Sequence, residues 1–206
     1  MARRIGKKLK NWAVTMRAAT VLLVTEAVAQ PLETPDLARP GDYAISLLAG
    51  RMTENGWQQI ILADDVRFPD AYLAGITLSR RFAYIGDRAE FDIEGQVVKH
   101  FGDQDHWEFN VDVLARWMKL PWNQWLPTHA GFGMGLSYAT QEPAVEVARS
   151  GSSSKLLLYW VAELEFSQPA QPWSVFIRLH HRSNVYGVVA EEGASNAVAL
   201  GIRRRF

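Results

Sequence analysis

Hydrophobic and polar residues alternate along most of the chain after residue 42. The alternation is sharpest in residues 106–119, where large apolar residues occupy every second position and Glu108, Asp112 and other polar residues lie between them. A period of two places successive side chains on opposite faces of a β-strand, so this pattern predicts strands with one apolar and one polar face. Eight segments follow it, namely residues 43–49, 71–84, 90–101, 106–119, 128–140, 155–167, 172–184 and 196–206.

Aromatic residues bracket the apolar face of the segment at 106–119. Trp107 and Trp117 stand at the two ends of an apolar band about 10 residues long, which is the length that a tilted strand needs to cross a bilayer. Tryptophan at both ends is typical of the aromatic girdles at the two membrane interfaces. The pattern therefore predicts strands that cross a membrane.

The connections between the predicted strands alternate in kind. Short or proline-bounded connections span residues 85–88, 121–127 and 169–172, and long polar connections span residues 53–70 and 141–154. Together with the even number of strands, this alternation predicts an all-β fold, an eight-stranded antiparallel transmembrane β-barrel with short periplasmic turns and long external loops. Residues 57–64 could form an extra strand or a short helix, and we interpret them as loop structure.

The polar faces of the predicted strands carry many charges. Since the interior of an eight-stranded barrel is filled by side chains, these charges predict a packed ionic plug and not a pore. The expected lumen residues are Glu90, Asp92, Glu94, Asp112, Glu163 and Glu165 against Arg116, Arg178 and Arg203. The glycines of residues 131–135 recur at period two, so we expect them to make room for lumen neighbours and not to form a phosphate-binding loop.

The N-terminal region has the parts of a secretory signal peptide. A basic start is followed by an apolar stretch and by the small-residue site Ala27-Val-Ala29. We therefore expect a signal peptide at residues 1–29, a proline-rich tether at 30–41 and the barrel at 42–206. The competing interpretation of the leader is a basic amphipathic helix at a membrane surface.

The charge balance and the absence of cysteine exclude some partners and some kinds of site. Removing residues 1–29 takes six basic residues and one acidic residue from totals of 22 each, so the mature chain is acidic by five charges. This balance argues against a nucleic-acid partner, because phosphate neutralisation needs a surplus of lysine and arginine. The absence of cysteine excludes disulfides and thiolate metal sites.

A histidine and a serine lie on one face near the end of the seventh predicted strand. His181 and Ser183 share the register of the apolar residues of that strand, so both are expected to project outward toward lipid, whereas His180 projects into the lumen. Asn196 begins the last predicted strand at the same height. A histidine base, a hydroxyl group and an amide that holds the ring form the general pattern of a hydrolytic triad.

The same stretch carries a family resemblance. The His-x-Ser-Asn sequence of residues 181–184, a glycine-containing loop and a final strand with Leu200-Gly-Ile-Arg203 that ends at Phe206 resemble the outer-membrane lipid A 3-O-deacylases of the PagL type. The resemblance is specific over the last two predicted strands. It implies a protein of the bacterial outer membrane that hydrolyses an acyl ester of lipid A, the lipid part of lipopolysaccharide, without a metal or cofactor.

Individual roles also follow from this resemblance. His181 corresponds to the family's base and Ser183 to its nucleophile, and the family's glutamate falls on Asn196. Asn184 or nearby backbone N–H groups would hold the oxyanion. An amide can orient an imidazole ring but cannot stabilise its positive charge as a carboxylate does, so the carboxylates of the last loop are possible substitute acids, namely Glu191 and Glu192.

Other interpretations stay open. A non-catalytic barrel could stabilise the envelope or bind a partner through the loops at 53–70 and 141–154, and another acyl ester hydrolase, such as a phospholipase, has the same chemistry. A homodimer is one option for the assembly. His100 and His106 could suggest a metal, but without a third convincing ligand we interpret them as part of a solvated loop and expect no metal site.

Overall fold

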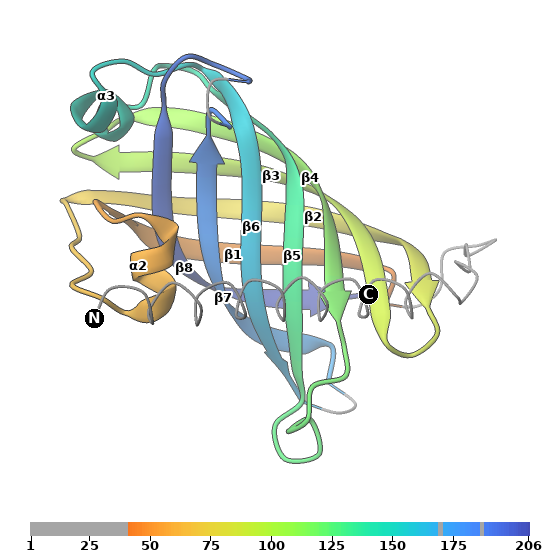
Figure 1. The fold of residues 1–206 in the computed structure, drawn as a ribbon. Helices are drawn as coiled ribbons and strands as arrows, with labels where there is room; N and C mark the ends of the chain where they lie inside the picture. Colours follow the sequence, from red (N-terminus) through yellow and green to blue (C-terminus); the bar gives the residue numbers. More distant parts are fainter. Residues whose placement is uncertain (1–40, 169–170, 186–187) are drawn as a thin grey trace, which may run out of the picture. The chain divides into compact units, whose positions relative to one another are not determined.

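The computed structural model describes residues 41–206, except residues 169–170 and 186–187. Its strands and helices, coloured along the sequence in Figure 1, are β1 (Tyr43–Thr53), α2 (Trp57–Leu62), β2 (Ala71–Ile85), β3 (Ala89–Gly102), β4 (His106–Trp117), β5 (Thr128–Ala139), α3 (Ala144–Ser150), β6 (Leu156–Ser167), β7 (Trp173–Ser183) and β8 (Ala194–Arg205). The expected signal peptide and residues 30–40 of the expected tether lie outside the described residues.

The eight strands form one closed antiparallel barrel, as the alternation predicts. Each strand pairs with the next along the chain, and β8 returns to pair with β1. The closing pair ends where Phe206 N donates to Tyr43 O at 2.9 Å and the two aromatic rings stack. Closure leaves no strand edge unpaired, which is what a membrane-spanning sheet requires.

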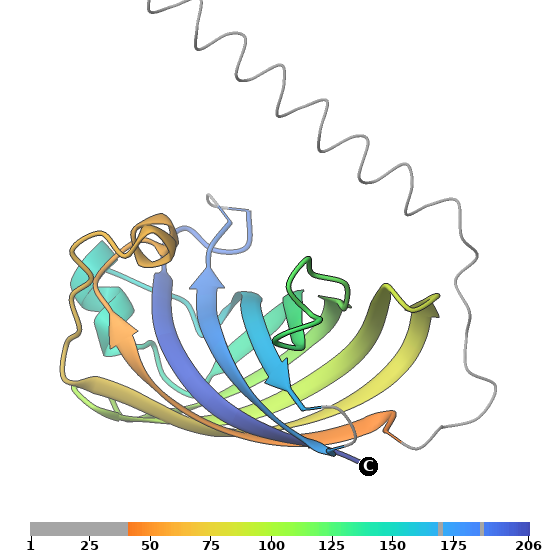
Figure 2. The ribbon, with the colours of Figure 1, turned by 90° about the horizontal axis from the view of Figure 1, so that it is seen from below.

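The two ends of the barrel differ. The connections β1–β2, β3–β4, β5–β6 and β7–β8 lie at one end, which we call the loop end, and the other connections lie at the turn end. Both helices belong to loop-end connections, and Figure 2 shows them on the same side of the barrel. Neither helix in the part of the chain that the structure describes is long and apolar enough to cross a membrane.

The interpretation of residues 57–64 as loop structure is wrong for most of the segment, which is the short helix α2. The side chain of Gln59 accepts a hydrogen bond from Gly56 N at 3.1 Å and so caps the first turn. Ala63 ends the helix in the left-handed conformation, with φ 53°. These local contacts define both ends of the helix. A helix of six residues is too short to be stable alone, so its packing on the barrel must stabilise it.

The two faces of the barrel wall are sorted as predicted. The outward positions are apolar and exposed, among them Leu47, Ile76, Val111, Phe132, Val175 and Ile202. All nine charged residues expected in the lumen are buried. Glu163 lies at the centre of their network: Arg178 Nη2 lies 2.5 Å and Arg203 Nη1 2.7 Å from its carboxylate oxygens.

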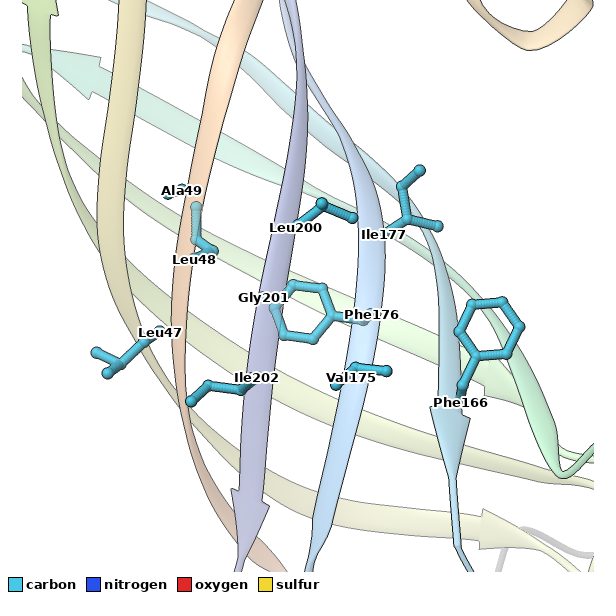
Figure 3. Close-up of a pocket in the computed structure, with 10 residues that line it drawn as sticks. All are labelled: Leu47, Leu48, Ala49, Phe166, Val175, Phe176, Ile177, Leu200, Gly201 and Ile202. Carbon is cyan, nitrogen blue, oxygen red and sulfur yellow. The ribbon is translucent and has the colours of Figure 1, made fainter.

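An aromatic ring completes the plug. Phe176 packs in the lumen with Arg178 and Arg203 against its ring, at 5.1 and 4.7 Å from guanidinium carbon to ring centroid. Figure 3 shows this ring beside Gly201 of the neighbouring strand. A Cβ atom at Gly201 would overlap the Phe176 ring, so only glycine fits there. Gly133 likewise faces Asp112 and Val161, which confirms that the glycines of β5 make room for lumen neighbours.

Candidate functional site

The structure brings His181 and Asn196 together on the outer wall of the barrel. The two residues lie directly opposite each other in the β7–β8 pair. His181 Nδ1 and Asn196 Oδ1 are 2.7 Å apart, and both side chains are buried, with 6% and 2% of their surfaces exposed. Sequence parity predicts this contact because both residues occupy the outward register near the loop end.

A backbone carbonyl determines which end of the Asn196 amide faces the histidine. Asn196 Nδ2 donates to Asn55 O at 2.9 Å, and a carbonyl oxygen can only accept. The amide oxygen must therefore face the ring, so His181 carries its proton on Nδ1 and keeps a lone pair on Nε2. This is the tautomer that a general base needs. Sequence reasoning misses Asn55, because its carbonyl comes from a loop distant along the chain.

Asn55 is itself held by its side chain. Asn55 Nδ2 donates to Asp65 O at 3.0 Å, and Asn55 Oδ1 accepts from Arg67 N at 2.6 Å. These two bonds join the beginning and the end of the β1–β2 connection. The loop therefore presents the Asn55 carbonyl in a defined place next to β8.

The register of His181 predicts that its side chain is exposed to lipid, but this side chain is buried. Along the outward face of β7, Val175 and Ile177 are 54% and 40% exposed, but Leu179 and His181 are buried. The Trp160 ring packs on His181 with centroids 4.4 Å apart, and Trp57 of α2 packs edge-on against Trp160. Trp160 thus covers the histidine, and the β1–β2 connection packs on Trp160, which the strand pattern alone cannot reveal.

Ser183 lies two residues further on the same face, at the end of β7. Its Oγ accepts a hydrogen bond from Val185 N at 3.1 Å, which leaves the hydroxyl hydrogen free to be donated. Within the described residues, no hydrogen bond joins Ser183 to His181. Val185 has φ 53°, a conformation that a β-branched residue adopts only under strain. Strained residues of this kind cluster at functional sites.

The remaining expected site residues belong to the β7–β8 connection. Asn184 Nδ2 donates to Glu191 O at 3.0 Å, and Asn184 N donates to Gly193 O, so this residue closes the loop. Glu191 and Glu192 are exposed, and the ring nitrogen that they would have to reach is already bonded to Asn196. The structure thus brings together His181 and Asn196 but neither glutamate.

Apolar grooves lie on the outer wall beside the site. One, of about 490 Å³, is lined mainly by apolar residues of α2, β6, β7 and β8, including Ile60, Leu164, Leu179 and Val198. A second, of about 590 Å³, lies closer to the turn end, and Figure 3 shows the side chains that line it. Both grooves offer apolar surface to a hydrocarbon chain.

The interpretation of His100 and His106 as part of a solvated loop is wrong. Both are buried in the lumen, directly opposite each other across the β3–β4 turn, and their rings stack. A third candidate ligand, Glu108, lies within reach of both. The period of two could have identified Glu108, because it is two residues from His106 and therefore on the same face.

Neither a protein-family model nor a curated protein matches this sequence. Among solved structures, the outer membrane enzyme PagL is similar with a TM-score of 0.50 and 10% identity, over 79% of this chain and 99% of that chain. Neisserial surface protein A (NspA) has a TM-score of 0.46 and 12% identity, over 82% and 99% of the two chains. At these identities, the likeness concerns the fold alone. The chain thus has the fold of eight-stranded outer-membrane β-barrels, and its apolar outer wall places it in the bacterial outer membrane.

Proposed function

We propose that this protein is an outer-membrane esterase that hydrolyses an acyl ester of lipid A with His181 as base and Ser183 as nucleophile. The observation that carries the proposal is the chain of hydrogen bonds from Asn55 O through the Asn196 amide to His181 Nδ1. This chain leaves the lone pair of His181 Nε2 free to accept a proton. Ser183 lies two residues away on the same face of the strand. The free lone pair on Nε2 and the Ser183 hydroxyl on the same face of β7 are what a base and its nucleophile require.

The reaction follows from these groups. His181 Nε2 takes the proton of the Ser183 hydroxyl while its oxygen attacks the ester carbonyl, and the resulting imidazolium returns the proton to the leaving alcohol. Water then attacks the acyl-serine with His181 again as base, which releases the fatty acid and restores the serine. Backbone N–H groups of the β7–β8 connection are the candidate donors to the oxyanion.

The position on the barrel supports a lipid substrate. His181 and Ser183 lie on the outer wall at the loop end, and two apolar grooves lie further along β7, the nearer of them lined by Leu179. An ester next to the hydrocarbon layer could reach the serine while its acyl chain lies on the wall. The resemblance of residues 181–184 and of the last strand to lipid A deacylases points to lipid A within this class. In the proposed cycle, the Ser183 side chain rotates toward Nε2 when substrate binds.

A non-catalytic barrel is the second candidate. The observation that favours it is the engagement of Ser183 Oγ by Val185 N, without a bond to His181 in the described part of the chain. In that case, Asn55, Asn196 and His181 would only fasten the β1–β2 connection to the barrel wall. The two candidates differ in whether Ser183 reacts.

Mass spectrometry of lipid A tests the proposal. Wild type, Ser183→Ala, His181→Ala and the control Ser152→Ala, which changes an exposed serine of the α3–β6 connection, are expressed in the outer membrane of a host that lacks such an activity. We expect wild type and the control to remove one acyl chain and the two site variants to remove none. Phospholipids from the same cells are analysed in parallel.

The outcomes separate the candidates. Unchanged lipid A and phospholipid in all strains, with folded barrel present in the membrane, would contradict the esterase and favour the non-catalytic barrel. Loss of acyl chains from phospholipid alone would move the substrate class to phospholipids. Equal activity of wild type and Ser183→Ala would remove Ser183 from the mechanism.

A further inference from the structure

Three histidines and a glutamate gather in the lumen near the loop end. The lumen histidine cluster consists of His100 on β3, His106 and Glu108 on β4, and His180 on β7. Each is at least 97% buried. The cluster faces inward, whereas His181 faces outward, so it belongs to a different site from the proposed esterase.

Glu108 joins the members of the cluster. Its Oε2 lies 2.8 Å from His100 Nε2, and its Oε1 lies 2.8 Å from His180 Nε2. The His100 and His106 rings stack with centroids 4.3 Å apart. One potential ligand atom from each of His100, His106 and Glu108 lies within 4.8 Å of the other two. Donor atoms of a tetrahedral zinc site lie about 3.3 Å apart, so a small adjustment would suffice.

Two polar atoms, one in the cluster and one beside it, lack partners among the described residues. His106 Nε2 is buried without a hydrogen bond, and so is Gln104 Oε1 in the β3–β4 turn. A buried polar atom without a partner loses its hydration and gains no hydrogen bond in return, so two such atoms at one place call for an explanation. A cation that accepts the lone pair of His106 Nε2 would satisfy the first.

The same cation would also account for Gln104. In the present arrangement, Gln104 Nε2 lies 2.8 Å from His100 Nδ1, which places the ring proton on Nε2 facing Glu108. When His100 Nε2 binds a cation, its proton moves to Nδ1, and a half-turn of the Gln104 amide brings the unpartnered Oε1 to accept it. Metal-bound histidines almost always donate their other ring N–H in this way.

We infer that His100, His106 and Glu108 form a binding site for a divalent transition-metal ion of the zinc class inside the barrel. Two imidazoles and one carboxylate are the protein ligands of known zinc sites, with a further position for water or another ligand. Imidazole nitrogens disfavour Mg²⁺ and Ca²⁺, which take oxygen ligands. His180 holds the second oxygen of Glu108 and so orients the carboxylate, and Gln104 orients His100.

The test is a titration of untagged, full-length protein purified in detergent and treated with a chelator. Zn²⁺ binding is measured by competition with a chromophoric chelator for wild type, His106→Gln and Gln104→Ala. The control is His129→Gln, which changes a histidine at the start of β5, at the turn end. We expect about one Zn²⁺ per chain for wild type and the control, and affinity more than about tenfold weaker for His106→Gln and about tenfold weaker for Gln104→Ala.

A second measurement, Co²⁺ binding to the wild-type protein, tests the inference even if a variant fails to fold. Co²⁺ bound to wild type should give visible d–d absorption typical of a four- or five-coordinate site with nitrogen ligands, and added Zn²⁺ should abolish it. Folding of each variant is checked by its resistance to unfolding in SDS before heating. Absence of saturable binding by wild type, or binding that His106→Gln leaves unchanged, would overturn the inference. Neither result depends on esterase activity.

Discussion

At residue 196, a neutral amide occupies the position where the family resemblance places a glutamate. An amide in such a position can present either its oxygen or its nitrogen to the histidine, and the wrong choice stabilises the wrong tautomer. Asn55 O removes this ambiguity because it accepts from Asn196 Nδ2. The positive charge of the imidazolium, however, gains less from an amide oxygen than from a carboxylate.

Two substitutions of Asn196 distinguish its effect on the orientation of the His181 ring from its effect on the charge of that ring. Asn196→Ala removes the acceptor of the Nδ1 proton, and we expect the esterase kcat to fall by about 100-fold or more, since a triad histidine held in the wrong tautomer costs about 10⁴-fold. Asn196→Asp keeps the acceptor and adds a charge, although its second oxygen then faces Asn55 O. We expect its kcat to exceed that of Asn196→Ala by at least about tenfold. Initial rates with purified lipid A in mixed micelles measure both.

The reverse order would contradict this role of Asn196. If the alanine variant is as fast as wild type, the amide does not act through His181. If both variants are equally slow, the bond to Asn55 O matters for the position of the loop and not for the tautomer. The KM of the two variants distinguishes these cases, because a displaced loop should alter substrate binding.

At the scale of elements, the β1–β2 connection joins the barrel wall to the candidate site. Its helix α2 packs Trp57 against Trp160, and its Asn55 holds Asn196. Ile61 and Leu62 of the same helix are 62% and 76% exposed, so one side of the helix offers apolar surface to its surroundings. This element packs on Trp160, the ring that covers His181.

We expect Trp57→Ala to uncover His181. Loss of the indole removes the edge contact with Trp160 and weakens the packing of α2 on the wall. Carbethoxylation of His181 by diethyl pyrocarbonate, followed by peptide mass spectrometry, should become several-fold faster than in wild type. Gln58→Ala, at an exposed position of the same helix, serves as the control and should leave the rate unchanged. Equal rates in all three proteins would show that α2 does not limit access.

At the scale of the whole molecule, the barrel is held from inside by charges and from outside by apolar side chains. Glu163 and Glu94 each contact Arg116, Arg178 and Arg203. Arg116 also contacts Asp92, and Arg203 also contacts Glu165. Buried charges of this kind stabilise only while each has its partners, because an unpaired one carries the full cost of desolvation. Loss of a single charged residue from the lumen should therefore lower the stability of the barrel strongly.

We expect Glu163→Gln to lower the free energy of unfolding by about 3–5 kcal/mol, since it removes one of the two carboxylates that contact all three buried arginines and leaves only Glu94 in that role. Urea-induced unfolding of barrel refolded in lipid vesicles, followed by tryptophan fluorescence, measures the change. The control Glu142→Gln alters an exposed glutamate of the β5–β6 connection and should change stability by less than about 0.5 kcal/mol. A similar loss in both variants would mean that the plug contributes no more than a surface charge.

The sequence by itself determined the number of strands, the face on which each side chain lies and the pairing of His181 with Asn196. These features depend on a period of two and on adjacent strands, so they can be seen along the chain. Only the tertiary structure decided that Asn55 O orients Asn196, that α2 packs on the tryptophan covering His181 and that His180 reaches Glu108. The physical reason is that loops have no periodicity to reveal where they fold back, and contacts across the lumen depend on how the closed barrel staggers its strands.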